Sequence, residues 1–82
     1  MSNYLVLGSL VFFDANGQTQ SVEPYRHLFD ANDDTTALEV AERYREERKN
    51  LLKQRGIEAM ISFTDLFEIS RRIQLPGEDI PF

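Results

Sequence analysis

The chain has 82 residues, enough for one small domain, and its 41% hydrophobic and 28% charged residues predict a folded protein rather than a disordered one. A net charge of −5 argues against a protein whose whole surface binds nucleic acid. The absence of cysteine excludes disulfides, thiolate catalysis and cysteine-ligated zinc. We expect neither a cofactor nor a metal site.

Residues 5–13 form the longest apolar run, and it falls short of the ~20 residues that a membrane-spanning helix needs. The run has the length of a signal-peptide core, but no basic residue precedes it and a poor cleavage site follows it. A buried strand is the better interpretation. We therefore expect a cytoplasmic protein without a membrane segment.

Aromatic, β-branched and aliphatic residues fill positions 4–13, which predicts a strand covered on both faces. Asn16-Gly17 follows and is a strong signal for a hairpin turn, because both residues tolerate positive φ. A second strand is expected from Gln18. Pro24 places that strand at a sheet edge or ends its pairing, because proline has no N–H to donate.

The clearest predicted element is a helix over residues 36–55. Thr36 and Glu39 fit a capping box at its start, and Gly56 suits the left-handed position after its end. Residues 57–63 then alternate between apolar and polar side chains, which indicates a half-buried strand.

Residues 65–74 fit two patterns. Thr64 can cap a helix with Leu66, Ile69 and Ile73 on one side, and the same stretch also alternates as a strand. The helix is preferred here. The expected fold is therefore a single α+β domain over residues 1–75 in the order β-β-α-β-α, with the 36–55 helix packed on a small, mostly antiparallel sheet, and a tail over 76–82. A final strand in place of the last helix is the alternative, and exposed sheet edges make a homodimer plausible.

Basic residues gather in the predicted helix. Residues 35–55 carry six basic and four acidic side chains, whereas the rest of the chain carries three and ten. One interpretation is a solvated helix face with internal ion pairs. The other is a patch that binds nucleic acid or an acidic partner, made of Arg45, Arg48, Lys49, Lys53 and Arg55.

Signals for catalysis are weak. The four glycines form neither a phosphate-binding loop nor a dinucleotide fingerprint. His27 could act as a general base oriented by Asp30, but no third group completes such a site. We therefore expect a protein that is not an enzyme, with no catalytic residues.

The chain ends in Glu78-Asp79-Ile80-Pro81-Phe82. These five residues resemble the tail tip of bacterial single-stranded DNA-binding proteins, in which acidic residues precede Ile-Pro-Phe. In that family the tip recruits replication, repair and recombination enzymes. The resemblance implies acidic steering by the first two residues, apolar contact by the next two and an anchor at Phe82.

Elementary chemistry is consistent with such a role. A terminal Phe combines an apolar ring with a free α-carboxylate, and a partner can bury the ring while an arginine or lysine holds the carboxylate. The alternative is a tail that packs Ile80 and Phe82 onto its own domain. No family is recognised for residues 1–75: the pattern predicts three strands, and the chain is short for the five-stranded barrel of that family. The chain is therefore either a divergent small binder or an unrelated domain that carries such a tip.

We expect a protein–protein interaction module of DNA replication or repair. Its tip would imitate the tail of a single-stranded DNA-binding protein and so recruit or inhibit an enzyme that binds such tails. The alternative is a small binder of single-stranded nucleic acid. In that case Tyr4, Phe12, Tyr25 and Phe29 would stack on bases while the arginine-rich helix follows the backbone.

Overall fold

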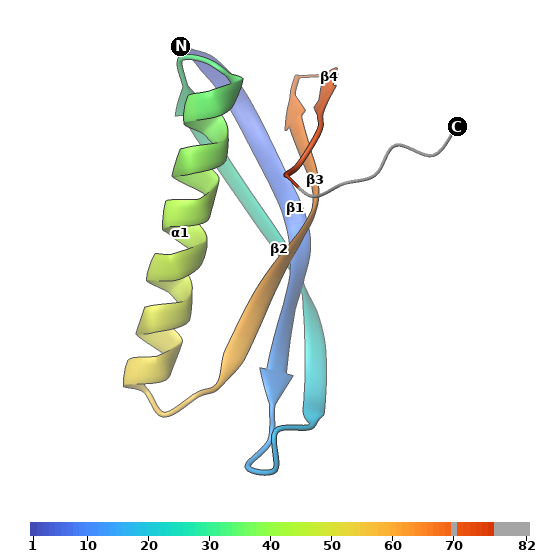
Figure 1. The fold of residues 1–82 in the computed structure, drawn as a ribbon, viewed down its shortest axis with the longest axis vertical. Coiled ribbons are helices and arrows are strands. Elements are labelled where there is room, and N and C mark those ends of the chain that lie inside the picture. Colours follow the sequence, from blue (N-terminus) through green and yellow to red (C-terminus); the bar gives the residue numbers. More distant parts are fainter. Residues whose placement is uncertain (70, 77–82) are drawn as a thin grey trace, which may run out of the picture.

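The computed structural model describes residues 1–69 and 71–76, which form one helix and one four-stranded antiparallel sheet (Figure 1). The strands lie in the spatial order β2-β1-β3-β4, and every neighbouring pair is antiparallel. The elements in chain order are β1 (Ser2–Phe13), β2 (Thr19–Ala31), α1 (Asp34–Gln54), β3 (Ala59–Glu68) and β4 (Arg71–Ile73).

The turn between β1 and β2 lies at Asn16-Gly17, as the sequence predicts. Gly17 has a φ of 78°, a conformation that costs glycine little. A carboxylate oxygen of Asp14 accepts hydrogen bonds from the backbone N–H groups of Asn16 (2.9 Å) and Gln18 (3.0 Å). The sequence of the turn therefore sets the register of the long β1–β2 hairpin.

Helix α1 begins two residues earlier than expected. Its N-cap is Asp33 rather than Thr36, and the Asp33 carboxylate accepts a hydrogen bond of 2.8 Å from the Thr36 backbone N–H. The helix ends at Gln54, and Gly56 follows with a φ of 77°. The helix therefore begins two residues before, and ends one residue before, the predicted range of 36–55.

The core lies between α1 and one face of the sheet. Tyr4, Val6 and Leu66 are almost completely buried, and they form one apolar cluster with Ala37 and Ala41 of the helix. A second, smaller cluster lies further along the strands and consists of Leu10, Leu52 and Ile61. Because strand side chains alternate, the even-numbered residues of β1 point toward α1.

The opposite face of the sheet, here called the open face, carries the odd-numbered residues of β1. The sequence predicts that positions 4–13 are covered on both sides, and this is wrong for the described residues. Helix α1 covers one face, and no described element covers the other (Figure 1). Packing against α1 thus explains the apolar residues on one face of β1, and no described element explains those on the open face.

The expected β-β-α-β-α order is also wrong. The segment expected to form a second helix continues β3 as far as Glu68, turns, and forms β4, so the observed order is β-β-α-β-β. Leu66 and Ile73 are direct partners in this ladder, and both are buried on the α1 side. A strand buries both residues against Tyr4 and Val6 and leaves Ile69 exposed at the turn, so tertiary packing decides the ambiguity.

Candidate functional site

The five basic residues of the predicted patch do not form one surface. Arg45, Lys49 and Lys53 follow one another at intervals of four residues and line depressions between α1 and the first half of β3. We call these three residues the basic stripe. Arg48 instead lines a groove between α1 and β2, and Arg55 caps the end of the helix.

The basic stripe is in contact with the sheet at its first member. The Arg45 guanidinium carbon lies 4.6 Å from the centre of the Phe63 ring, within the range of a cation–π contact. Glu46 and Glu58 border the same depressions, so the stripe has three cations against two carboxylates. Its surroundings are net positive in a chain that is net negative.

A backbone edge runs beside the basic stripe. Phe13 donates its N–H to the Glu58 carbonyl (3.0 Å), and the Leu7 carbonyl accepts from the Thr64 hydroxyl (3.3 Å), so odd-numbered residues of β1 turn their backbone toward β3. In the first half of β3 the even-numbered residues are therefore the ones that turn toward β1. Ala59, Ile61 and Phe63 consequently turn their N–H and C=O groups outward.

No described strand pairs with this outward edge over residues 59–63, because β4 pairs only with residues 66–68 of β3. Beyond Phe63 the edge is closed, since the Arg72 side chain donates to the Thr64 carbonyl at 3.1 Å and to the Asp65 carboxylate at 2.9 Å. The free edge therefore has a defined length of five residues and contains no proline.

The outer edge of β2 is different. Even-numbered residues of β1 turn toward β2, and their partners on β2 are odd-numbered, so Pro24 turns toward the free side. Its missing N–H interrupts the middle of this edge, a common protection against pairing with another strand. Within residues 1–69 and 71–76, the outer edge of β2 is thus interrupted, whereas the edge of β3 over residues 59–63 is not.

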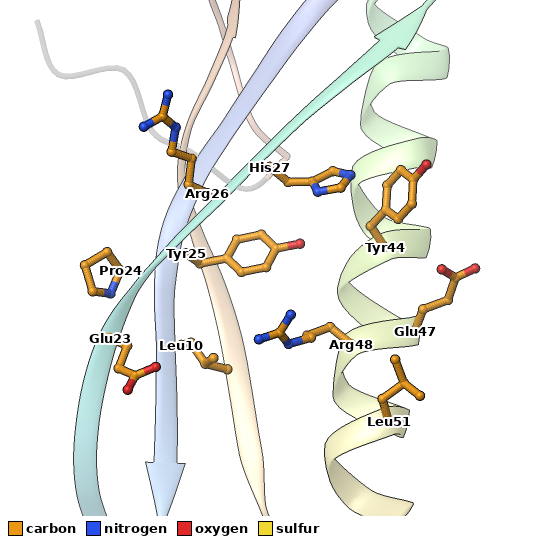
Figure 2. A pocket seen from close by; sticks show the side chains of 10 residues that line it. All are labelled: Leu10, Glu23, Pro24, Tyr25, Arg26, His27, Tyr44, Glu47, Arg48 and Leu51. Carbon is orange, nitrogen blue, oxygen red and sulfur yellow. The ribbon is translucent and has the colours of Figure 1, made fainter.

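The groove between α1 and β2 has a volume of about 280 Å³ (Figure 2). Arg48 and Tyr25 point into it from opposite sides, and the His27 ring contacts the Tyr44 ring at a tilt of 52°, with 4.1 Å between the ring centres. Burial raises the pKa of Tyr25, although the nearby Arg48 and Arg45 guanidiniums partly oppose the shift. Glu23 and Glu47 also line the groove, so two carboxylates stand against the one guanidinium, that of Arg48, that points into it.

The residues proposed for a general-base site are not brought together. His27 is the partner of Val6 on the α1 side of the sheet, whereas Asp30 is the partner of Asn3 on the open face. An interval of three residues along a strand places two side chains on opposite faces. Among the described residues, no group of three metal-binding side chains comes together either.

The aromatic residues proposed to stack on bases all point toward α1. Tyr4 is 1% exposed, and its hydroxyl donates to Asp34 at 3.0 Å. The Phe29 ring lies between Tyr4 and His27, and the Tyr25 ring stacks on Phe63. Phe12 packs against the smaller core cluster. These rings are occupied by intramolecular contacts and do not form an exposed stacking surface.

One ionic cluster was not apparent from the sequence. Arg71 bonds to both Asp34 and Glu68, and Tyr4 also donates to Asp34. The hydrogen bond from Arg71 is the main cause that lowers the pKa of Asp34 and of Glu68. Every member of the cluster already has a partner, so it joins secondary-structure elements rather than offering a binding site.

The predicted partner-binding residues Glu78, Asp79, Ile80, Pro81 and Phe82 lie outside the described residues. Within the described part of the chain, α1 is too polar to span a membrane. No protein-family model, no curated protein and no solved structure matches the chain. Its fold and surface define a two-layer domain of one helix on a four-stranded antiparallel sheet, with a free edge of β3 beside a basic stripe.

Proposed function

We propose that this chain is a non-enzymatic protein-interaction module that binds an extended acidic segment of a partner protein along the free edge of β3. The observation that carries the proposal is the juxtaposition of the unpaired residues 59–63 with the basic stripe of α1. An added strand gains main-chain hydrogen bonds from such an edge, and its side chains provide the specificity.

The spacing of the basic stripe suits a strand. Residues four apart on a helix are about 6 Å apart along its axis, and residues two apart on a strand are about 7 Å apart. Carboxylates on every second residue of an incoming strand would therefore meet Arg45, Lys49 and Lys53 in turn. Charge complementarity of this kind raises the association rate and excludes basic partners.

A peptide titration tests the proposal. The probe is a labelled peptide of alternating glutamate and valine, and the matched control peptide has glutamine in place of glutamate. We expect the acidic peptide to bind and its affinity to fall on the order of tenfold in the double variant Lys49→Glu/Lys53→Glu. The control variant Arg43→Glu, on the solvent side of α1, should bind like the parent.

A second variant separates strand addition from simple charge attraction. Ala59→Pro removes one outward N–H without removing a bond to β1, as Pro24 does in β2. We expect it to weaken binding of the acidic peptide. Equal binding of both peptides would overturn the proposal. So would preferential binding of a single-stranded oligonucleotide that depends on Lys49 and Lys53 but not on Ala59, since that pattern indicates a nucleic-acid surface.

Residues 78–82 carry a separate proposal, for which their sequence is the support. We propose that they bind an enzyme that recognises the tails of single-stranded DNA-binding proteins, with Phe82 as the anchor. Phe82→Ala should abolish this binding in a calorimetric titration, and Gln74→Ala should not affect it. Unchanged affinity of Phe82→Ala would reject this role.

A further inference from the structure

The open face of the sheet is unusually apolar for a surface in contact with water. Val22 is 58% exposed, Leu28 63% and Met60 47%. Antiparallel sheets with one solvated face normally alternate apolar and polar residues along each strand, and β1 does not. Exposed large apolar side chains gathered on one face of a sheet generally mark an interaction site.

The strand register arranges the open face into four rows that cross β2, β1 and β3 in that order. Two rows are apolar, one contains hydroxyl groups and one has opposite charges at its two ends. The rows are Leu28–Leu5–Phe67, Arg26–Leu7–Asp65, Pro24–Ser9–Ser62 and Val22–Val11–Met60. Figure 2 shows that the Arg26 side chain leaves β2 on the side opposite to Tyr25 and His27, which point toward α1.

We propose that a second copy of this chain packs on the open face, sheet against sheet, about a two-fold axis that runs along β1. Rotation about such an axis places each row opposite the same row of the other copy, and it places β2 of one copy opposite β3 of the other. Leu28 then faces Phe67 of the other copy, Val22 faces Met60, and Arg26 faces Asp65. The proposal goes beyond the strand-addition site, because it concerns a different surface and partner.

The charges select this axis over the alternatives. An axis perpendicular to the strands would place Arg26 opposite Pro24 and Asp65 opposite Ser62, so that neither charge gains a partner. Pairing of two β2 edges would bring Pro24 into the centre of the new ladder, where it cannot donate. With the axis along β1, each apolar row meets an apolar row and each charge meets its opposite.

The available area is that of a weak dimer. The three strands lie side by side over residues 4–12 of β1, and at about 4.8 Å per strand and ~3.4 Å per residue they offer roughly 440 Å² from each copy, or about 900 Å² in total. This value falls in the size range of weak, transient complexes, so we expect a dimer that dissociates on dilution. Asp65 also bonds to Arg72, which lies on β4 at the rim of this area, so Asp65 is held in place before the second copy arrives.

The test uses two charge reversals and their mixture. In a dimer of the Arg26→Asp variant, the facing side chains at positions 26 and 65 are both acidic. In a dimer of the Asp65→Arg variant, the facing side chains at these two positions are both basic. An equimolar mixture forms a heterodimer in which both contacts are again between opposite charges. We expect the parent to sediment as a dimer, each variant alone to dissociate at least about tenfold more readily, and the mixture to recover the dimer.

Controls separate folding from association. Arg43→Asp, on the solvent side of α1, and Ala59→Pro, at the free edge of β3, should both leave the dimer intact. If Ala59→Pro loses binding of the acidic peptide but keeps the dimer, the loss therefore concerns the strand-addition site alone. If Asp65→Arg does not fold, Leu28→Lys replaces it, and this variant should be a folded monomer.

Three results would overturn the proposal. The first is a parent protein that remains monomeric at all concentrations, as expected if residues 77–82 or an unrelated protein cover the open face. The second is a mixture of the two charge-reversal variants that stays monomeric, which would exclude the opposition of Arg26 and Asp65. The third is a folded Leu28→Lys variant that dimerises like the parent.

Discussion

The guanidinium of Arg71 donates to both carboxylate oxygens of Asp34, at 2.9 and 2.8 Å, and so joins β4 to the first residue of α1. Asp34 also accepts from the Tyr4 hydroxyl on β1, so three elements meet at one carboxylate. Strand β4 has only three residues. Its attachment to the domain therefore depends on this ionic contact as well as on the burial of Ile73.

The Asp34–Arg71 pair predicts a loss of stability in acid. Hydrogen bonds from Arg71 lower the pKa of Asp34 below 3.8 and that of Glu68 below 4.5. A lowered pKa in the native state stabilises the fold above the ordinary value, and the contribution disappears as the pH falls through the lowered pKa. We expect the free energy of unfolding in urea to decrease below about pH 4.5.

The variant Arg71→Leu should be less stable at pH 7 and lose less stability between pH 7 and pH 3 than the parent does. Arg43→Leu, which removes a cation from the solvent side of α1, serves as the control and should keep the acid sensitivity of the parent. An identical pH profile for Arg71→Leu and the parent would contradict this assignment.

Tyr4 predicts a second loss of stability, at alkaline pH. Burial, assisted by the hydrogen bond to Asp34, raises the pKa of Tyr4 from 10.0 to about 12. The native state therefore gains stability below pH 10 and loses it as the pH rises toward 12. Tyr4→Phe should flatten the stability profile over this interval in chemical unfolding, whereas Tyr44→Phe, on the more exposed ring, should not. Parallel profiles for the parent and Tyr4→Phe would rule out the effect.

Gly8 marks a close approach between β1 and β3. A Cβ atom at Gly8 would lie 2.1 Å from the backbone oxygen of Ser62, next to the irregular step in the β1–β3 register. We expect Gly8→Ala to destabilise the protein by about 1–3 kcal/mol, because the backbone itself must move. Thermal unfolding measures the effect.

Gly56→Ala is the matched control for Gly8→Ala, since a Cβ atom there meets nothing within 4 Å and only the positive φ of 77° is unfavourable. Its cost should be about 1 kcal/mol. A larger loss for Gly56→Ala than for Gly8→Ala would mean that β1 and β3 are further apart than described.

The two faces of the sheet should respond differently to truncation. Leu66 is fully buried against α1, so Leu66→Ala should cost about 2–5 kcal/mol through lost burial and the cavity it leaves. Leu28 is 63% exposed on the open face, and Leu28→Ala should change the stability of the monomer by less than about 0.5 kcal/mol. Urea unfolding at low protein concentration checks both values, and equal losses would contradict the assignment of the two faces.

The candidate site could be predicted only in part. The basic residues of the helix were recognisable from composition, but their division between two grooves depends on where α1 rests on the sheet. The free edge of β3 could not be foreseen, because it requires that β4 be short and that it pair beyond residue 63. Asp34 and Arg71 are 37 positions apart in the sequence, so no local sequence pattern indicates that they pair.

Local chemistry in the sequence was sufficient to determine the hairpin turn at Asn16-Gly17 and the approximate position of the helix before Gly56. Each depends on interactions among neighbours along the chain, such as the bonds from Asp14 to its own turn. The conformation of residues 65–73 was decided only by tertiary structure, since the same apolar spacing suits a helix and a strand. The presence of β1 as a partner, and of α1 to bury Leu66 and Ile73 together, makes the strand the lower free-energy state.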